Sequence, residues 1–285
     1  MIGNAGRLGI IAGSGMLPVY VADAARAAGE DPFIFPLKNE ADRRWTAFDH
    51  AVISVGDLRQ LASLIKRHDI KRVVMSGAVK KRPNFNEIHV NLRFLMKLPF
   101  AVKTVLSGGD DAVLKMVIQL IESQGCRVVG AHDIAPQLLA ELGPLGQHTP
   151  NDEDKRDIAS AMRAADALGR LDVGQGAVSV GGRIVALEGV EGTDRMLQRV
   201  AELRAEGRIS AKRRGVLVKL CKPQQDIRAD LPTIGQSTID AVAAAGLSGV
   251  AVQAGRALLL QREETLKRAD AAGIFVYGLD LEMEP

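Results

Sequence analysis

Short apolar runs alternate with helix-length segments through the first half of this chain. Runs of strand length lie at residues 8–12, 32–36, 51–55, 72–75 and 127–129. Helical patterns begin at Pro18, Asp57 and Gly108 and separate most of these runs. Strands that alternate with helices of about 10 to 15 residues form a parallel sheet covered by helices. We therefore predict a Rossmann-like α/β domain over residues 1–135.

The chain changes character between residues 136 and 150. Proline and glycine interrupt this stretch repeatedly, and the turn His148–Asp152 ends it by capping a new helix that continues to Leu168. Such stretches are typical of connections between domains. We predict a linker over residues 136–150 and a second domain over residues 151–285.

The second half pairs its strands differently. Two apolar segments, 177–180 and 183–187, flank Gly181-Gly182, which is a strong hairpin signal. A second hairpin is predicted between 249–252 and 257–260, across Gly255. Helices after Asp194 and from 262 to 272, with strands at 215–220 and 273–277, complete a mixed-sheet α/β domain that is distinct from the first.

Charge and composition exclude several classes of protein. The net charge is only +3 and aromatic residues make up 4%, so neither a basic nucleic-acid surface nor a stacking platform is expected. Cys126 and Cys221 lie in or beside apolar segments without a CxxC pair, and we expect reduced core thiols. No apolar run approaches the roughly 20 residues that cross a bilayer, and no signal peptide is recognisable. We expect a cytoplasmic protein.

The first glycine-rich loop, Gly13-Ser14-Gly15-Met16, connects the first strand to the first helix. Backbone N–H groups there could hold a phosphate, with the helix dipole favouring its charge; a purely structural turn is the alternative. The dinucleotide fingerprint requires a third glycine where this chain has Pro18. The second strand ends in Pro36-Leu37-Lys38, with no carboxylate placed to bind an adenosine ribose. A nicotinamide-dependent reductase is therefore disfavoured.

A second turn, Ser76 to Lys81, follows the carboxyl end of another strand, where open α/β sheets place their ligands. Gly77 and Ala78 permit close approach, and Lys80 could face a phosphate or simply be solvated. Asp110-Asp111 at the start of a helix needs no ligand, because helix capping explains it.

Acidic and basic residues gather most densely in the second half. The segment Leu187–Asp194 contains three acids at the start of a helix. The segment Lys222–Gly235 contains acids, an arginine and a glutamine, and it follows a strand that ends in a lysine. Acids can hold Mg²⁺ while cations neutralise a pyrophosphate under attack; ordinary surface ion pairs are the alternative. The catalytic candidates are Asp226, Glu188, Asp194, Lys219, Lys222 and Arg228. The three acids among them are also candidate metal ligands: Asp226, Glu188 and Asp194. The candidate substrate contacts are Thr149, Gln225, Thr233 and Gly235.

Five segments in this order resemble one protein family over nearly the whole chain. They are Gly9–Pro18, Ser76–Lys80, Gly109–Asp111, Glu188–Asp194 and Lys222–Pro232. The sequence resembles the LpxI family, the UDP-2,3-diacylglucosamine pyrophosphatases of lipid A biosynthesis in Gram-negative bacteria.

The resemblance implies a Rossmann-like domain linked to a distinct C-terminal domain, with the acylated UDP-sugar held between them. It implies Mg²⁺-dependent hydrolysis to 2,3-diacylglucosamine 1-phosphate (lipid X) and UMP, with water attacking the β-phosphorus and an essential aspartate at Asp226. A homodimer is also implied, and the lipid substrate suggests transient contact with the cytoplasmic face of the inner membrane. The apolar segment 94–102 is a candidate wall for the acyl chains, or part of an ordinary core. A non-catalytic nucleotide-sugar or lipid carrier is the alternative function.

Overall fold

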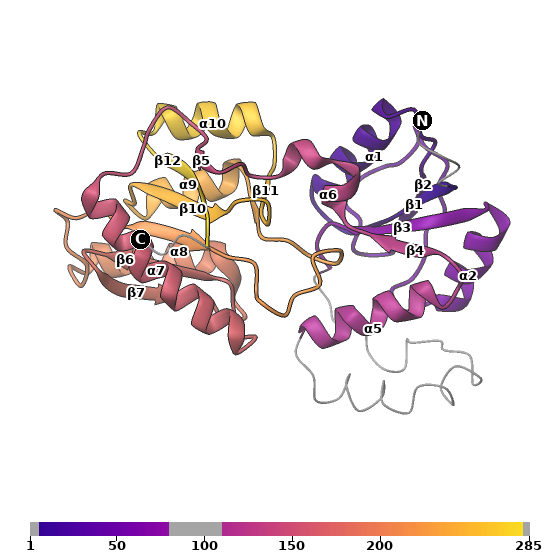
Figure 1. Ribbon diagram of the computed structural model, residues 1–285, viewed down its shortest axis with the longest axis horizontal. Coiled ribbons are helices and arrows are strands. Elements are labelled where there is room, and N and C mark those ends of the chain that lie inside the picture. Colours follow the sequence, from indigo (N-terminus) through magenta and orange to yellow (C-terminus); the bar gives the residue numbers. More distant parts are fainter. Residues whose placement is uncertain (1–5, 80–109, 282–285) are drawn as a thin grey trace. The chain divides into compact units, whose positions relative to one another are not determined.

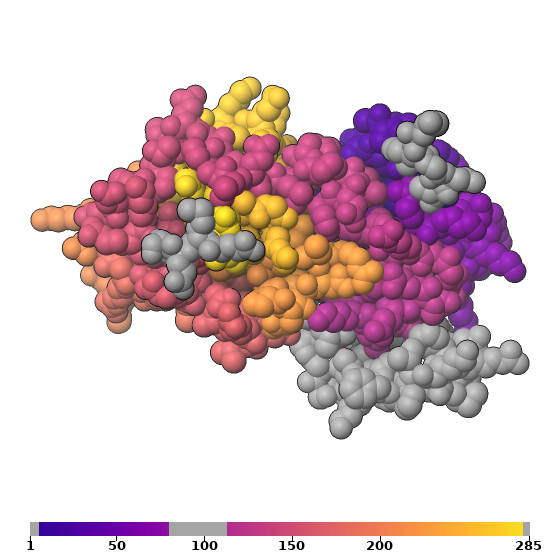
Figure 2. Space-filling model, viewed as in Figure 1, coloured from indigo at the N-terminus to yellow at the C-terminus, as the bar shows by residue number. Residues whose placement is uncertain are grey.

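A computed structural model describes residues 6–79 and 110–281, and Figures 1 and 2 draw the remaining residues in grey. The chain forms two compact units. The first contains Met1–Gln137 and Asp226–Asp230, and the second contains Leu138–Gln225 and Leu231–Pro285. Both units are α/β, which confirms the predicted fold class. Lys80 and the segment 94–102 lie outside the described residues.

The first unit is built on a parallel sheet in the order β2-β1-β3-β4. The central strand β1 is buried from Leu8 to Ala12, because it has a hydrogen-bonded neighbour on each side. This burial explains the continuous apolar run in the sequence. The strands are β1 (Arg7–Ala12), β2 (Phe33–Pro36), β3 (Ile70–Ser76) and β4 (Arg127–Val129).

Helices cover this sheet on both faces (Figure 1). The aliphatic side chains of α2 and α5 pack together with Ile11, Val73 and Val128 in one core cluster. Figure 1 shows α1 on the other side of the sheet. Asp57 caps α2 by accepting the N–H of Gln60, as its position predicts. The helices are α1 (Leu17–Ala27), α2 (Leu58–Arg67), α5 (Asp110–Glu122) and α6 (Ala131–Ile134), followed by a 3₁₀ turn, η2 (Pro136–Leu138).

The predicted strand at residues 51–55 is wrong. The chain runs beside β2 there and forms only isolated bridges, Ile34 with His50 and Leu37 with Ile53. Ile34 of β2 donates its N–H to this segment. The next residue of β2 that faces the segment is Pro36, whose carbonyl accepts the N–H of Ile53 but which donates nothing in return. Proline has no N–H, so one hydrogen bond of the ladder is missing at Pro36, and the pairing resumes only where Lys38 donates to the carbonyl of Ile53.

The second unit contains a six-stranded mixed sheet in the order β5-β12-β10-β8-β6-β7. Its central strands β12, β10 and β8 are parallel, and β6 runs antiparallel to both β8 and β7. The strands are β5 (Gly143–Pro144), β6 (Gly176–Val180), β7 (Arg183–Leu187), β8 (Val216–Lys219), β10 (Gly249–Gln253) and β12 (Phe275–Leu279), with a separate two-stranded sheet of β9 (Thr233–Ile234) and β11 (Leu258–Leu259).

Alternate side chains of β8 enter two different cores. Val216 and Val218 pack with α7 (Asp152–Arg170), whereas Leu217 packs with α8 (Gly192–Ala205), α9 (Gln236–Ala244) and α10 (Arg262–Ala271). Successive side chains of a strand point to opposite faces of the sheet, so these contacts show that helices lie on both faces. Among the described residues no helix is long and apolar enough to cross a bilayer.

One predicted hairpin is confirmed and the other is wrong. β6 and β7 pair through Gly181 and Gly182, which both have positive φ as a tight hairpin turn requires. The second pairing fails because β10 is already hydrogen-bonded on both edges, to β8 and to β12. The segment after Gly255 therefore pairs elsewhere, with Leu258 opposite Thr233.

Two segments belong to a different unit from the one the sequence suggests. Residues 138–150, interpreted as linker, belong to the second unit, where Gly143 pairs with Gly278 on the open edge of β12. Residues 226–230 belong to the first unit, where Ala229 packs against the core cluster formed by α2 and α5. Hydrogen bonding to an open strand edge and apolar packing decide these assignments.

Candidate active site

Asp226 forms a two-point ion pair with Arg228 in the first unit. Arg228 donates from Nε to Oδ1 at 3.0 Å and from Nη2 to Oδ2 at 2.8 Å, and its backbone N–H also reaches Oδ1 at 3.0 Å. The third guanidinium nitrogen, Nη1, donates to Glu122 Oε1 at 3.0 Å. Arg228, expected to bind pyrophosphate, is thus engaged by two carboxylates of its own unit.

This ion pair lowers the pKa of Asp226. The hydrogen bonds from the Arg228 side chain are the largest cause of the lowered pKa, and burial of Asp226 opposes them. Smaller contributions in the same direction come from the Arg228 backbone N–H, the Arg228 charge and the charge of Lys115. The same contacts raise the pKa of Arg228. Asp226 is therefore held ionised, which suits a carboxylate that holds a cation or accepts a hydrogen bond from water.

Glu188 is a buried carboxylate with one unpartnered oxygen. Only 6% of the residue is exposed, and Thr193 donates from Oγ1 to Glu188 Oε1 at 2.7 Å. Within the described residues Oε2 has no hydrogen-bond partner. It lies against Gly176, where an added β-carbon would come within 2.6 Å of it. Glycine at 176 therefore makes room for the carboxylate, and an unpaired buried oxygen points to a function.

Lys219 starts on the same face of the sheet as this carboxylate. It ends β8 directly opposite Gly176 of β6, so its side chain starts on the face where Glu188 Oε2 lies. Lys219 is 6% exposed and donates from Nζ to the carbonyl of Thr233 at 3.3 Å. The register of β6 and β8 thus places an acid and a cation on one face of the sheet, and the cation contacts Thr233, a predicted substrate contact.

Lys222 and Gln225 have structural partners in the second unit. The Nζ of Lys222 lies 2.6 Å from Oδ1 of Asp172. Gln225 is 8% exposed, and its Oε1 accepts the backbone N–H of Lys222 at 3.1 Å. The Gln225 carboxamide thus braces the turn that contains it, and its role as a substrate contact stays a prediction.

The glycine-rich loop of the first unit uses its N–H groups internally. Gly13 donates to Ser76, and Ser14 exchanges backbone hydrogen bonds with Ala78. The N–H of Gly15 points at both oxygens of Asp42, at 3.2 Å each. The expected phosphate cradle is thus occupied by the protein's own acceptors.

Glycine is needed where these two loops meet. A β-carbon at Gly13 would come within 2.5 Å of the Ala78 carbonyl oxygen, and one at Gly77 within 2.6 Å of the Ser14 oxygen. This close approach favours the structural interpretation of the glycine turn. Met16 forms the N-cap of α1, without a side-chain capping bond.

The other candidate residues lie apart from these contacts or act through their backbone. Asp194 is exposed in the first turn of α8, and it is the neighbouring Thr193 that forms the hydrogen bond with Glu188. Thr149 is exposed, and no described hydrogen bond joins it to the other candidates. Gly235 is the extended N-cap residue of α9 and follows β9, whose Thr233 contacts Lys219.

The candidate metal ligands do not form a closed metal site. Among residues 6–79 and 110–281, no three His, Cys, Asp or Glu side chains gather closely enough to hold a metal ion. Both oxygens of Asp226 are bonded to Arg228, whereas Glu188 keeps Oε2 unpartnered among the described atoms. Magnesium commonly takes one or two carboxylates and obtains its other ligands from water and substrate phosphates. Glu188, within the second unit, therefore fits a Mg²⁺ ion that arrives with a pyrophosphate.

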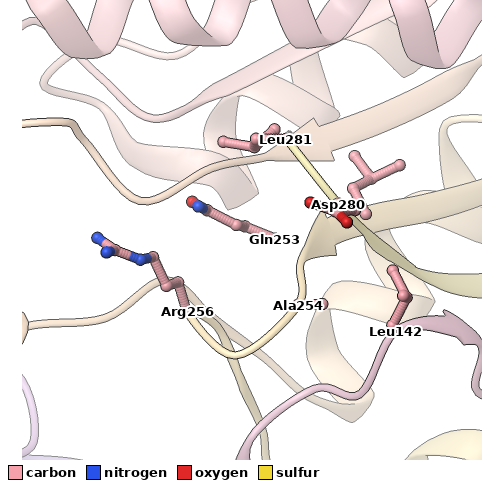
Figure 3. A pocket seen from close by; sticks show the side chains of 7 residues that line it. Leu142, Gln253, Ala254, Arg256, Asp280 and Leu281 are labelled. Carbon is pink, nitrogen blue, oxygen red and sulfur yellow. The ribbon is translucent and has the colours of Figure 1, made fainter. Parts of the chain in front are cut away.

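A cavity of about 300 Å³ lies at the carboxyl ends of β10 and β12 (Figure 3). In Figure 3 the side chains of Gln253 and Arg256 point to the same side. Gln253 also accepts the backbone N–H of Cys221 at 3.2 Å, so it connects this cavity to the chain that leaves β8. The cavity is lined by Leu142, Gln253, Ala254, Arg256, Leu279, Asp280 and Leu281.

Sequence reasoning missed the residues that hold the candidates in place. Thr193 could have been inferred from its position five residues after Glu188 at a helix start. The others carry no local signal, because their partners are distant in sequence. They are Glu122, Asp172, Gly176 and Gln253.

Comparisons with known proteins agree across both units. A family model described as the LpxI N-terminal domain matches residues 7–138, and one described as the LpxI C-terminal domain matches residues 141–277. The UDP-2,3-diacylglucosamine pyrophosphatase LpxI of Caulobacter vibrioides is 39% identical over 280 residues, which cover 98% of this chain and 99% of that protein. An isoflavone reductase crystal structure aligns over 97% of this chain and 79% of its own, with 12% identity and a TM-score of 0.30, from which nothing is concluded.

Proposed function

The chain belongs to the LpxI family, and from this premise we propose that it hydrolyses the pyrophosphate bond of UDP-2,3-diacylglucosamine. The products are 2,3-diacylglucosamine 1-phosphate and UMP. The supporting observation is the 39% identity to a pyrophosphatase of that name, which extends over almost the full length of both chains.

In the proposed reaction, water attacks the β-phosphorus. A bond forms between the water oxygen and that phosphorus, and the bond from the phosphorus to the bridging oxygen breaks. UMP leaves with the bridging oxygen, the lipid product keeps the water oxygen, and the two protons of the water go to the product phosphates or to solvent. The protein must therefore stabilise the negative charge that develops on the bridging and β-phosphate oxygens.

Asp226 and Glu188 are the carboxylates to which we assign direct roles. Asp226 is held ionised and oriented by Arg228, so it can hold a cation or accept a hydrogen bond from the attacking water. Glu188 has one oxygen bonded to Thr193 and the other without a partner among the described atoms. Each of these carboxylates, within its own unit, is a candidate to hold Mg²⁺, which when bound would neutralise pyrophosphate charge and increase the electrophilicity of phosphorus.

Lys219 is the cation that we assign to the phosphates. It lies at the carboxyl end of a parallel strand, where α/β sheets bind ligands, and on the same face of the sheet as the Glu188 carboxylate. An ammonium there can donate to phosphate oxygens while it remains bonded to Thr233. Lys222 and Arg228 already bind carboxylates, so their charges act first within the protein.

The substrate carries two acyl chains, and we propose that the enzyme meets it at the cytoplasmic face of the inner membrane, as a peripheral protein. Burial of each CH₂ group contributes about 0.8 kcal/mol, so the chains keep the substrate in the bilayer. A homodimer is the assembly we expect from the family.

The deciding experiment is hydrolysis of the acylated UDP-sugar in ¹⁸O-water, with Mg²⁺ and with EDTA. We expect the label in the lipid product and Mg²⁺-dependent UMP release. Label in UMP would mean attack at the α-phosphorus. Binding of the substrate without any UMP release under either condition would favour the alternative, a lipid or nucleotide-sugar carrier.

A further inference from the structure

The cavity at the carboxyl ends of β10 and β12 is lined by residues of the second unit alone. Gln253 ends β10 and lies opposite Leu279, which ends β12. Val252, the residue before Gln253, lies opposite Lys219 at the end of the parallel strand β8. The cavity therefore lies at the same edge of the sheet as Lys219, and this is the edge where α/β sheets bind ligands.

The loop at residues 254–256, which forms part of the cavity wall, is held by backbone hydrogen bonds. Ala254 donates its N–H to the Leu279 carbonyl at 2.9 Å, and Gly255 donates to the Ala140 carbonyl at 2.8 Å. Gly255 has a φ of +67°, which glycine adopts without strain. The backbone that carries Arg256 is thus fixed before any ligand arrives, which lowers the entropic cost of binding.

Gln253 offers an amide donor to a ligand in the cavity. Its carboxamide contacts the backbone N–H of Cys221 at 3.2 Å, and because a backbone N–H only donates, the contacting atom is the oxygen Oε1. The oxygen therefore faces the chain that leaves β8, and the amino group Nε2 is the end that a ligand can use. In Figure 3 the polar end of Gln253 lies on the same side as that of Arg256.

The other lining residues add one donor, one acceptor and an apolar surface. Arg256 is exposed and only donates, whereas an ionised Asp280 only accepts. Leu142, Leu279 and Leu281 supply the apolar part of the lining. The volume of about 300 Å³ is at the lower end for ligand pockets, so it suits one ring system better than two acyl chains.

Uracil has the complementary pattern of hydrogen-bonding groups. Its pairing edge carries one N–H between two carbonyl oxygens, so it accepts from two donors and donates to one acceptor. Cytosine has an amino group in place of one carbonyl and a bare nitrogen in place of the N–H, so its edge would set donor against donor and acceptor against acceptor. The flat faces of the ring are largely apolar and suit leucine side chains.

We propose that this cavity binds the uracil of the substrate, with Gln253 and Arg256 donating to its carbonyls and Asp280 accepting its N–H. The inference rests on the proposed function, because it locates one part of the proposed substrate. Lys219, the cation assigned to the phosphates, ends the strand next to Gln253. The base and the pyrophosphate are then bound along one edge of the same sheet.

The test is calorimetric binding of UDP and of CDP, each with Mg²⁺, to the wild-type chain and to Gln253→Glu and Asp280→Asn. Glutamate keeps an oxygen for the Cys221 N–H but replaces the Nε2 donor by an acceptor, and asparagine puts a donor where the aspartate has only acceptors. Both ligands carry the same phosphates, so the ratio of their Kd values cancels the effect of an altered charge on phosphate binding. We expect the wild-type chain to bind UDP at least about tenfold more tightly than CDP, and each variant to prefer UDP by less than about threefold.

Lys267→Gln, at an exposed position of α10, is the control. It lowers the net charge by one, as Gln253→Glu does, and should keep the wild-type ratio of Kd values. Circular dichroism checks that each variant folds. An unchanged ratio in either folded variant overturns the proposal, and so does weaker binding of glucosamine 1-phosphate with UDP binding unchanged, because the sugar would then occupy the cavity.

The same measurements separate this proposal from the proposed function. If the wild-type chain releases UMP from the acylated UDP-sugar but binds UDP no more tightly than CDP, the uracil assignment is wrong and the hydrolytic function stands. A wild-type chain that binds neither nucleotide and releases no UMP would instead refute the proposed function itself.

Discussion

Arg228 contacts both oxygens of Asp226, with Nε 3.0 Å from Oδ1 and Nη2 2.8 Å from Oδ2. A fork of this kind fixes the plane of the carboxylate as well as its charge. Glu122 binds the third guanidinium nitrogen and so fixes the arginine in turn. The aspartate on which the proposed chemistry depends is therefore oriented by helix α5, more than 100 residues away in sequence.

Asp226→Asn should abolish most hydrolysis while the fold persists. The amide keeps the shape but loses the charge that would hold a cation, and we expect kcat/KM to fall by at least about 100-fold. Asp230→Asn, in the same loop, should stay within about threefold of wild type. UMP release measures both, with circular dichroism as the test of folding. Equal losses in the two variants would mean that the loop needs acids in general and not Asp226 in particular.

Arg228→Gln should shift the acid limb of the pH–rate profile to higher pH. Hydrogen bonding from Arg228 is the largest cause of the lowered pKa of Asp226, so its removal raises that pKa. The ionised aspartate then persists over a narrower range on the acid side. The measurement is kcat/KM against pH for both proteins, and an unmoved acid limb would show that Asp226 does not control it.

The Asp226–Arg228 pair also makes the folded state more stable at neutral than at acidic pH. A carboxylate whose pKa is lowered on folding stabilises the folded state at any pH above its pKa in the unfolded chain, which is near 3.9 for aspartate. That contribution is lost as the pH falls through the lowered pKa of the folded state. Arg228→Gln should therefore narrow the stability difference between neutral and acidic pH. Urea unfolding of both proteins at several pH values would show it.

Gly176→Ala should impair hydrolysis through Glu188. The new methyl group would lie 2.6 Å from Oε2, so the carboxylate must move. We expect a loss of more than about tenfold in kcat/KM, together with an overpacking cost of about 1–3 kcal/mol in unfolding free energy. Glu188→Gln, which adds no volume, should lose activity without that cost. An active Gly176→Ala enzyme would show that the position of Oε2 is irrelevant to the reaction.

Asp157→Ala should destabilise the second unit. Asp157 is 3% exposed and accepts hydrogen bonds from Ser179 Oγ at 2.6 Å and from the N–H groups of Gly181 at 3.0 Å and Gly182 at 2.6 Å. Loss of these charged hydrogen bonds at the β6–β7 turn should lower the unfolding free energy by about 3 kcal/mol. Lys155→Ala, at an exposed position of the same helix, should change it by less than about 0.5 kcal/mol. Denaturant titration would compare them.

Magnesium alone should leave the melting temperature unchanged within about 1 °C, because the described residues hold no closed metal site. Magnesium together with UDP should raise it above the value for UDP alone, if phosphate oxygens complete the coordination. Thermal melts with EDTA, Mg²⁺, UDP and both ligands make the comparison. A clear shift with Mg²⁺ alone would indicate a resident metal site.

The elements predicted well are those specified by neighbours in the sequence. The Asp57 cap and the Gly181–Gly182 hairpin depend on contacts over a few residues. Burial of β1 was also readable, since a strand covered on both faces must be apolar throughout. The motifs at Glu188 and Lys222 identified the family for the same reason.

Partners distant in sequence were decided only by the tertiary structure. The segment at Leu258 had the composition of a hairpin strand but met a β10 with both edges occupied, and Pro36 interrupted the hydrogen-bond ladder beside residues 51–55. In the site, the register of β6 and β8 places Gly176 opposite Lys219, and packing of Ala229 places Asp226 with the first unit. Residue type determines which chemistry is possible, whereas strand register, helix ends and core packing determine which side chains meet.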